Sequence, residues 1–340
     1  MIFTKEWLGE FTDLSNVSDQ DLLDALTAMG ISSFKCTSHF QADLPENRPD
    51  LHSIAGIARI AAAALKKEFQ QTDSGFSASP DNCIFGYLDM DVPAESCLRL
   101  SARMACSCRT GPSPGWMQDR LTALGLSPSG LLRDIADYVR LETGMPVRLV
   151  DARQFPEGSL RIREAFPGEE VPVSGKILQM DGGEPIISDE AYTALSPAGT
   201  EGTLLPEDCR DVFIFCGAYA PEIMKTMVEK AGNPTENLIQ NCLNLSPMGT
   251  IPALDRACSL LQQLASAEIT DGTLDCLNYV PQPESLPMPE DLEPDILTGL
   301  KTLGFQEVGK KLEIPWFRGD ILNTQDLEQE ILRLNTAFSL

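Results

Sequence analysis

Residues 131–151, LLRDIADYVRLETGMPVRLVD, constrain the fold more than any other segment of the chain. In its first half, the residues expected on one face follow each other mostly at intervals of three or four, namely Leu132, Ile135, Tyr138, Val139 and Glu142. This spacing is typical of a helix with one buried face. Gly144 can adopt the left-handed conformation that closes a helix, and Pro146 prevents the helix from resuming. With the β-prone residues 147–150 and the closing Asp151, the segment predicts a helix, a tight turn and a strand.

This unit would present Asp137 and Arg148 towards one cleft on a packed scaffold. One interpretation is an ion pair between the two side chains, which at a surface contributes little to stability. The other is a binding site. The planar fork of an arginine can hold a carboxylate or a phosphate, and an aspartate can receive an ammonium group. Together they would fit a small amino-acid-like ligand that carries both charges.

The overall charge excludes some classes of partner. The 340 residues include 50 acidic and 26 basic ones, giving a formal net charge of −24. Such a balance opposes a phosphate backbone, so we expect weak or no tRNA binding. No apolar run reaches the roughly 18 residues needed to span a bilayer, and the N-terminus carries no secretory signal pattern. We therefore expect a cytoplasmic protein without membrane contact.

The cysteines and histidines indicate neither a metal site nor a cofactor. The ten cysteines include no C-x-x-C pair, the closest two being Cys106 and Cys108, and reduced thiols are expected. Only His39 and His52 are present, so a zinc site would need several distant thiolates. Both histidines lie near the N-terminus, and a Cys-His catalytic dyad would require the domains to fold over each other.

The order of the patterns predicts an α+β protein. A polar stretch at 67–82 and the proline-rich PQPESLPMPEDLEP, which begins at Pro281, are expected linkers. Between them, residues 83–280 predict a central domain with a mixed β-sheet and surrounding helices. Residues 1–66 form an N-terminal module that is expected to pack with 290–340, as a small bipartite α/β module; 281–340 comprise the second linker and the C-terminal module.

Individual elements follow from spacing and caps. Helices are predicted near 18–29, after the turn at 47–50, at 112–124, 253–266, 295–303 and 324–334. Strands are predicted at 84–92, 99–108, 160–164, 177–180, 185–188, 212–215 and 276–280, with a strand pair near 311–315. In the final helix, Asp326, Glu328 and Glu330 are expected on the exposed side.

Four long segments resemble the β subunit of bacterial phenylalanyl-tRNA synthetase. MIFTKEWLGEF with LLDALTAMGI is similar to the start of that subunit, and ENRPDLHSIAGIARIAAAAL to its Asn-Arg-Pro-Asp segment. SARMACSCRTGPSPGWMQDRLTALGL with RDIADYVRLETGMPVRLVD resembles its editing module, and LKTLGFQEVGKKLEIPWFRGDILNTQDLEQEILRLN the segment after it. The OB-fold tRNA-binding insert of the family would fall between Ile31 and Leu44, where only about a dozen residues stand. The family's catalytic-like and anticodon-binding domains would follow Leu334 and are not expected here.

The resemblance also implies which residues should form the editing pocket. In the family this module hydrolyses tyrosine attached to phenylalanine tRNA, using a Thr-Asn pair, a His and a Glu. These positions fall here on Ala136 and Asp137, on Arg148 and on Cys216. Each has changed type: Ala136 offers no hydrogen bond, Arg148 stays protonated and cannot shuttle a proton, and Cys216 replaces a carboxylate.

The glycine-rich loop of the family is kept in part, with Gly199 and Gly202 in the sequence AGTEG. No residue is assigned a catalytic role, and the aminoacylating site of the family belongs to its α subunit. We therefore expect a β-subunit-like protein without ligase activity, whose degenerate editing domain binds a ligand or a protein partner. An α subunit is the weaker partner candidate, because the family's main α-contacting domains would lie beyond Leu340. The alternative is a trans-editing hydrolase that deacylates misacylated tRNA, with water positioned by backbone groups.

Overall fold

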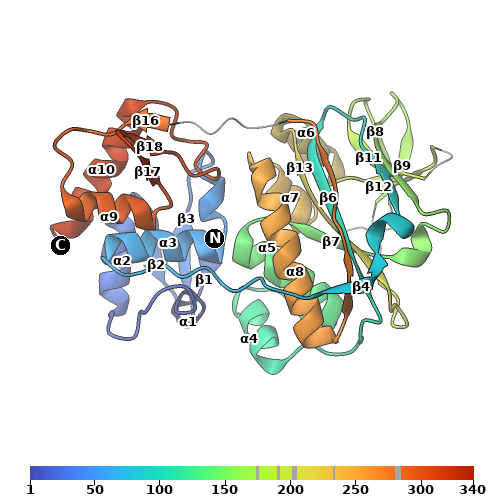
Figure 1. Cartoon of the computed structure of the whole chain (residues 1–340), viewed down its shortest axis with the longest axis horizontal. Coiled ribbons are helices and arrows are strands. Elements are labelled where there is room, and N and C mark those ends of the chain that lie inside the picture. Colours follow the sequence, from blue (N-terminus) through green and yellow to red (C-terminus); the bar gives the residue numbers. More distant parts are fainter. Residues whose placement is uncertain (174–175, 190–191, 201–204, 233, 280–284) are drawn as a thin grey trace.

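The computed structural model describes residues 1–173, 176–189, 192–200, 205–232, 234–279 and 285–340, arranged as two lobes side by side (Figure 1). One lobe combines the two ends of the chain, and the other contains its middle part. Helices and sheets occur in both lobes, which confirms the predicted α+β class. Within these ranges no helix is long and apolar enough to cross a bilayer.

The first lobe is built from two segments that are far apart in the sequence. Its N-terminal elements are β1 (Ile2–Phe3), α1 (Lys5–Leu8), α2 (Asp19–Ala28), β2 (Ser32–Lys35), β3 (Phe40–Asp43), η1 (Pro49–Leu51) and α3 (Ile54–Ala64). Its C-terminal elements are β16 (Ser285–Pro287), α9 (Pro294–Thr302), β17 (Gln306–Val308), β18 (Lys311–Glu313) and α10 (Thr324–Phe338). Helix α10 packs on α2, α3 and α9, and α3 also contacts α9. At the start of α3, a Cβ at Gly56 would lie 1.8 Å from the carbonyl oxygen of Asp50, so a glycine is needed where η1 packs against this helix.

The second lobe contains the unit that the sequence predicted most clearly. Helix α5 (Leu131–Thr143) ends at Gly144, whose φ is +79°, and strand β7 (Val147–Asp151) follows, as expected. The other elements of this lobe are β4 (Ala78–Cys83), η2 (Ile84–Gly86), β5 (Asp89–Asp91), β6 (Cys97–Cys106), α4 (Gly115–Ala123), η3 (Ala152–Gln154), β8 (Ser159–Glu164), β9 (Glu170–Val173), β10 (Lys176–Gln179), β11 (Pro185–Ser188), β12 (Ala194–Pro197), β13 (Val212–Tyr219), α6 (Pro221–Ala231), α7 (Glu236–Asn241), η4 (Pro247–Gly249), α8 (Thr250–Ala265), β14 (Glu268–Asp271) and β15 (Leu274–Leu277).

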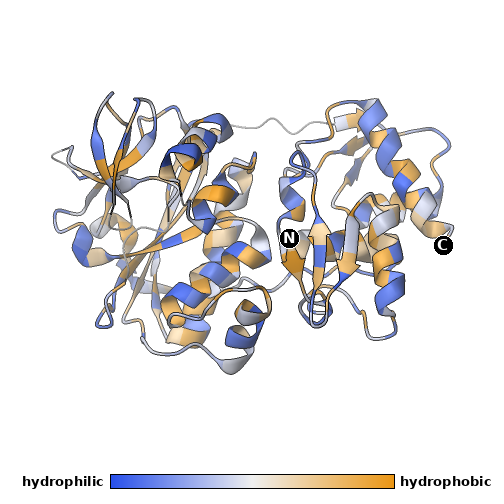
Figure 2. Ribbon diagram, turned by 180° about the vertical axis from the view of Figure 1, so that it is seen from behind, coloured by the Kyte–Doolittle hydropathy of each residue, from blue (hydrophilic) through white to orange (hydrophobic). Residues whose placement is uncertain are grey.

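The main sheet of this lobe has the described strand order β4-β14-β6-β13-β7, with β15 also pairing with β6. Helices α5 and α8 cover one face, and a second sheet, ordered β12-β11-β8-β5, packs on the other. The helices carry hydrophobic residues along one side and hydrophilic residues along the other (Figure 2). Side chains of β13 alternate between the two cores: Val212 and Ile214 face the helices, while Phe213 and Phe215 face the second sheet. β13 is thus buried on both faces.

Several predicted elements need correction. The expected linker at 67–82 includes β4, which pairs in parallel with β14. The expected strand at 84–92 is divided into η2 and β5, and the expected strand at 276–280 is β15, which ends at Leu277; residue 280 lies outside the described ranges. Helices α6 and α7 were not predicted. The apolar Met224 and Met227, which are buried here, and a proline at the first helical position were the available signals for α6.

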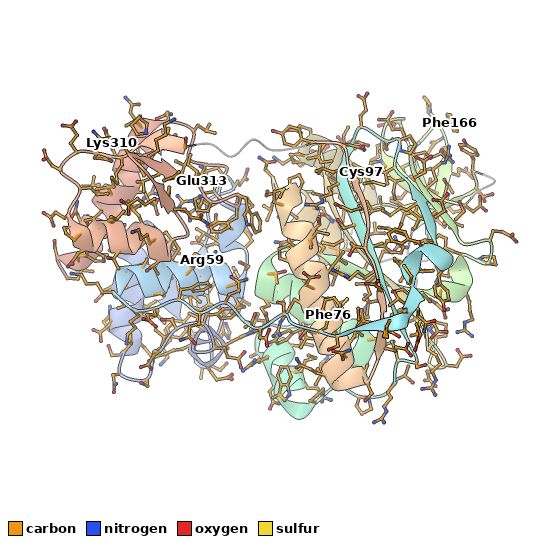
Figure 3. The ribbon with its side chains drawn as sticks, in the orientation of Figure 1. Arg59, Phe76, Cys97, Phe166, Lys310 and Glu313 are labelled. Atoms are coloured by element: carbon orange, nitrogen blue, oxygen red, sulfur yellow. The ribbon has the colours of Figure 1, made fainter. Side chains whose placement is uncertain are left out.

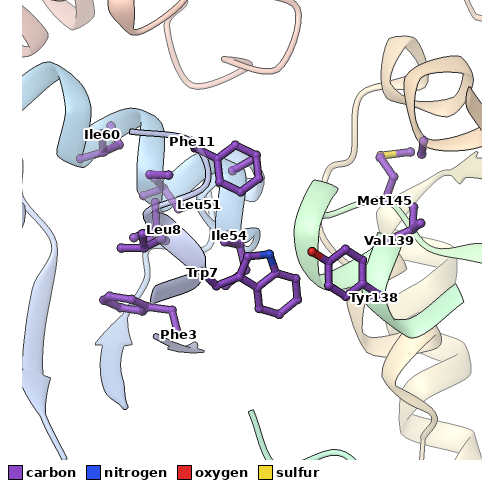
Figure 4. Packing of buried hydrophobic residues seen from close by; sticks show 14 of the residues in the cluster. Phe3, Trp7, Leu8, Phe11, Leu51, Ile54, Ile60, Tyr138, Val139 and Met145 are labelled. Atoms are coloured by element: carbon purple, nitrogen blue, oxygen red, sulfur yellow. The ribbon is translucent and has the colours of Figure 1, made fainter. Parts of the chain in front are cut away.

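The two lobes meet through a stacked aromatic pair. Trp7 of α1 and Tyr138 of α5 have ring centroids 4.6 Å apart and nearly parallel planes (Figure 4). Arg120 of α4 donates to the Tyr138 hydroxyl at 2.9 Å and to the carboxylates of Glu6 and Glu10 at 2.8 and 2.6 Å. One continuous hydrophobic cluster runs from the first lobe into α5 and α8. The lobes therefore share a core rather than touching through a polar surface.

The expected exposure of Glu330 is wrong. Its side chain is fully buried and accepts hydrogen bonds from Arg318 at 3.2 and 3.0 Å, and from Arg333 at 2.8 Å. Arg318 is also buried, and its Nε and Nη2 donate to the Asp320 carboxylate at 2.7 and 2.9 Å. Burial alone would raise the pKa of Glu330. The positive charge and the hydrogen bonds of Arg318 together outweigh this effect, so the pKa lies below its ordinary value. Helical spacing could not reveal this partner, which comes from the preceding loop.

We predict that Glu330→Gln lowers the free energy of unfolding by about 3–5 kcal/mol, because it removes one partner of a buried ion pair. Urea denaturation at neutral pH measures this loss. Glu328→Gln, on the exposed side of the same helix, is the matched control and should change stability by less than about 0.5 kcal/mol. Equal effects of the two substitutions would contradict the burial argument.

The same pair predicts a pH dependence. Because the folded-state pKa of Glu330 is lowered, its contribution is present above the unfolded pKa of about 4.3 and is lost as pH falls through the folded pKa. The stability difference between the wild type and Glu330→Gln should therefore narrow below pH 4. A difference that stays constant down to acid unfolding would show that the ionised carboxylate is not what stabilises α10.

Candidate functional site

Asp137 and Arg148 line one small cavity at the β7 edge of the main sheet. The cavity measures about 30 Å³, and its wall also includes Ala136, from the same helix turn as Asp137, and Asn237 of α7. The Asp137 carboxylate accepts a hydrogen bond from Arg140 at 3.4 Å, and Arg148 donates to the hydroxyl of Ser196 on β12 at 3.0 Å. The predicted helix-turn-strand unit thus brings three of the expected pocket residues together.

Arg148 also lines a second cavity, of about 20 Å³, between the two sheets. Gly199 contributes to this wall with a φ of +79°, and its carbonyl accepts a hydrogen bond from Asn241 at 3.0 Å. A Cβ at Gly199 would lie 3.2 Å from the sulfur of Met224 and 3.3 Å from the Asn241 amide, so a larger residue would crowd the loop. The expected companion Gly202 lies outside the described residues.

Both cavities have room for little more than a water molecule. A single water needs at least about 10–15 Å³ by this measure, whereas ligand pockets span about 300–1,000 Å³. Large side chains occupy the space between the sheets, with Phe215 and Tyr219 both nearly buried and in the wall of the second cavity. Burial raises the pKa of the Tyr219 hydroxyl well above its ordinary value, so it stays protonated. The region around Arg148 is packed rather than open.

Cys216 does not belong to this group of residues. Its side chain points to the opposite face of the sheet, into the core with α5 and α8, and its thiol lies 3.4 Å from the Pro146 carbonyl oxygen. The neighbouring Phe215 and Gly217 line the cavity instead. A shift of one residue along a strand moves every side chain to the other face. The placement of Cys216 in the pocket is therefore corrected.

No histidine is among the described residues that line the two cavities, and Asp137 is their one carboxylate. His52 ends η1 in the first lobe, where burial is the main cause that lowers its pKa, and it lines neither cavity. The lobes do approach here, since Gln240 donates to the carbonyl oxygens of His52 and Gly144. Within the described ranges, no group of three or more His, Cys, Asp or Glu residues could hold a metal ion. Arg148 can orient an anion or an acceptor, but it cannot take up a proton.

Four residues of this region were not predicted, namely Ser196, Tyr219, Asn237 and Asn241. All four lie in the second sheet, in β13 or in the short α7, and their distance in sequence from Arg148 hid the contact. The polar Asn237 and Asn241 recur four positions apart in ENLIQN, which is the only local signal that one helix face presents amides to a neighbour.

With this geometry described, comparison with known families identifies the domain. Residues 96–266, which cover the lobe from β6 to the end of α8, match the B3/4 domain. The chain belongs to the B3/4 domain family. The match includes every expected pocket residue, so the packed region around Arg148 lies within the family's own fold.

Curated relatives extend the likeness beyond this domain. The chain is 26% identical over 309 residues to the phenylalanine-tRNA ligase beta subunit of Clostridium tetani, covering 86% of this chain and 39% of that protein. It is 29% identical over 314 residues to the subunit of the same name from Brucella abortus, covering 86% and 38%. The chain thus spans about two fifths of the length of these relatives.

A solved structure supports the arrangement of the fold. The N-terminal fragment of the phenylalanyl-tRNA synthetase beta subunit from Pyrococcus horikoshii is similar with a TM-score of 0.50 and 14% identity. The match covers 100% of this chain and 99% of that fragment. At this identity the likeness concerns the fold alone.

We predict that Cys216 resists alkylation in the folded protein. Burial raises the pKa of its thiol far above the ordinary range, so little thiolate exists at pH 8, whereas Cys83 is exposed. Iodoacetamide labelling followed by peptide mass spectrometry should modify Cys83 more than about tenfold faster than Cys216. In urea both should react. Fast labelling of Cys216 in the native state would place it at an accessible site after all.

Proposed function

We propose that this chain is a phenylalanyl-tRNA synthetase β-subunit-like protein whose B3/4 domain does not hydrolyse aminoacyl esters. The observation that carries the proposal is the packing around Arg148. Cavities of about 20 and 30 Å³ leave no room for an aminoacyl group, and the guanidinium is engaged with Ser196. The same packing disfavours a free zwitterion held between Asp137 and Arg148.

The charge of the chain supports the loss of a tRNA substrate. A formal net charge of −24 repels a polyphosphate backbone, and neutralising phosphates requires clustered Lys and Arg. The arginines of the B3/4 domain are largely held by carboxylates: Arg99 binds Asp275, Arg103 binds Asp255, and Arg163 binds Glu169. Little positive charge is left for an acceptor stem. We therefore propose a domain that serves as a binding module or scaffold.

The partner of such a module is part of the proposal. The relatives are named as β subunits, and a subunit belongs to an assembly. An α-type subunit is one candidate partner for this chain. Another protein that can bind an acidic surface is the second candidate. The retained B3/4 scaffold is the observation that favours the alternative proposal, a trans-editing hydrolase that uses backbone groups to position water.

The decisive measurement is the deacylation of tyrosyl-tRNA specific for phenylalanine by the purified chain. We expect hydrolysis at the buffer rate, because the described cavities leave little space for an aminoacyl group and the Asp137 carboxylate accepts a hydrogen bond from Arg140. We also expect no retention of tRNA at low salt, where electrostatic binding is strongest. Mild alkali provides the positive control that the ester is labile.

Arg148→Ala and Asp137→Ala variants distinguish the two proposals. Both should behave like the wild type, since neither side chain takes part in a reaction. Hydrolysis by the wild type that collapses in either variant would establish an editing enzyme with a rebuilt pocket and overturn the non-catalytic proposal.

A further inference from the structure

A much larger cavity lies elsewhere, where the two lobes meet. It measures about 330 Å³, within the range of small-molecule sites. Its walls come from the start of α3, from residues 71–74 between the lobes, from the end of α5, from the start of α8 and from the loop that carries Trp316 and Phe317. None of the expected editing-pocket residues that the structure describes lines it. Interfaces between domains are common places for ligand sites.

Arg59 of α3, labelled in Figure 3, is one of the charged groups in the wall of this cavity. Its guanidinium is held between two aromatic rings, 4.5 Å from the centroid of Phe69 and 4.3 Å from that of Phe317. Within the described part of the chain, Arg59 makes no direct ion pair or hydrogen bond; besides the two ring contacts, its charge interacts favourably with the nearby carboxylate of Asp50. Burial is the main cause that lowers the pKa of Arg59 to about 10; the negative charge of Asp50 opposes this shift and the positive charge of Arg318 adds to it, so Arg59 stays protonated at neutral pH.

The other charged groups in the wall already have partners. Asp50 accepts two hydrogen bonds from Arg48, both at 2.8 Å. Glu142 accepts two from Arg256, at 2.7 and 3.1 Å, and a third from the Thr72 hydroxyl at 2.8 Å. Among the charged side chains of the described wall, the N–H groups of Arg59 are thus the ones that make no hydrogen bond within the protein. An arginine fixed between rings presents its planar fork in one orientation, which suits two parallel hydrogen bonds to a carboxylate.

The remaining wall combines aromatic and apolar surface with uncharged polar side chains such as Gln71 and Ser246. Trp316 is 47% exposed, and its indole is available to stack on a ring within the cavity. Met145, Leu245 and Pro252 add apolar surface. The carboxylates of Asp50 and Glu142 are close enough to disfavour a dianion such as phosphate, whereas a monoanion would balance the single charge of Arg59.

We propose that this junction cavity binds an aromatic monocarboxylate. The carboxylate takes both hydrogen bonds of the Arg59 fork, and the aromatic body lies against Trp316. Because both lobes contribute to the wall, the ligand stabilises their docked arrangement. This site is independent of the region around Arg148 and of the function proposed for it.

Fluorine NMR of the whole chain labelled with 5-fluorotryptophan tests the proposal. The protein has three tryptophans, Trp7, Trp116 and Trp316, each assigned by replacement with phenylalanine. We expect naphthoate to bind with roughly millimolar affinity, so it is titrated to about 10 mM. The Trp316 resonance should shift in a saturable way. Trp116 is 41% exposed but lies outside the cavity and provides the internal control. Naphthamide, which lacks the charge, should leave Trp316 unshifted.

Two variants separate the site from the fold. Arg59→Gln should weaken naphthoate binding by about tenfold or more, the range for a charge-assisted hydrogen bond. Arg161→Gln, which removes an arginine stacked on Tyr192 in the other lobe, should leave it unchanged. Ser74→Phe, at the cavity wall, should abolish binding without touching any charge.

Each contrary result overturns the proposal. The absence of a saturable shift of Trp316 in the wild type would contradict the proposal. So would equal naphthoate affinity in an Arg59→Gln variant whose circular dichroism shows that it is folded. Equal binding of naphthamide would show an apolar cavity that does not use Arg59. A phosphate-induced shift that competes fully with naphthoate would show an inorganic anion site instead. Loss of binding in Ser74→Phe with unchanged melting temperature would confirm that the cavity is the site.

Discussion

The buried pair between Glu142 and Arg256 connects more of this molecule than any other interaction. Glu142 lies on α5 and is 1% exposed, and Arg256 lies on α8, so the pair joins the two helices that cover the main sheet. The same carboxylate binds Thr72, and Arg256 donates to the carbonyl oxygen of Asp73 at 3.0 Å. One ion pair thereby fixes the helix layer and the chain segment that enters it from the other lobe. Its burial requires that every donor and acceptor be matched, since an unpaired charge here would be strongly unfavourable.

Helix α5 contacts the first lobe and the main sheet, and it lines both the small cavity beside Arg148 and the large cavity between the lobes. Tyr138 contacts Trp7 across the junction, and Glu142 binds α8 one turn later. On another side of the helix, Ala136 and Asp137 line the small cavity beside Arg148. The turn after α5 brings Gly144 against Ser53 of the first lobe, where a Cβ would approach the Ser53 side chain to 3.2 Å. The glycine thus serves two needs, the left-handed helix end and the close approach of the lobes.

The local parts of this architecture could be predicted from the sequence, and the long-range parts could not. Helical spacing, Gly144 and Pro146 predicted α5, its end and β7, because these depend on residues within one turn of each other. The partner of Glu142 lies more than a hundred residues away, and nothing in the spacing around either residue indicates it. Glu330 was expected in solvent for the same reason, since Arg318 and not the helix pattern decides its burial. At β13 the sequence did not show which face Cys216 occupies: it lies in the helix-side core, whereas the adjacent Phe215 and Gly217 line the cavity.

The contrast between the two cavity regions has a physical origin in the charges that line them. Around Arg148 the guanidinium donates to the Ser196 hydroxyl, and aromatic rings occupy the space between the sheets. Around Arg59 the rings of Phe69 and Phe317 hold the guanidinium in place but accept no conventional hydrogen bond from it. Cation–π contacts stabilise the charge without using the in-plane N–H donors. Because Arg59 is partly exposed, its donors remain available to solvent or to the acceptors of a ligand. The same residue type therefore closes one region of the molecule and keeps another open, according to whether its neighbours are acceptors or rings.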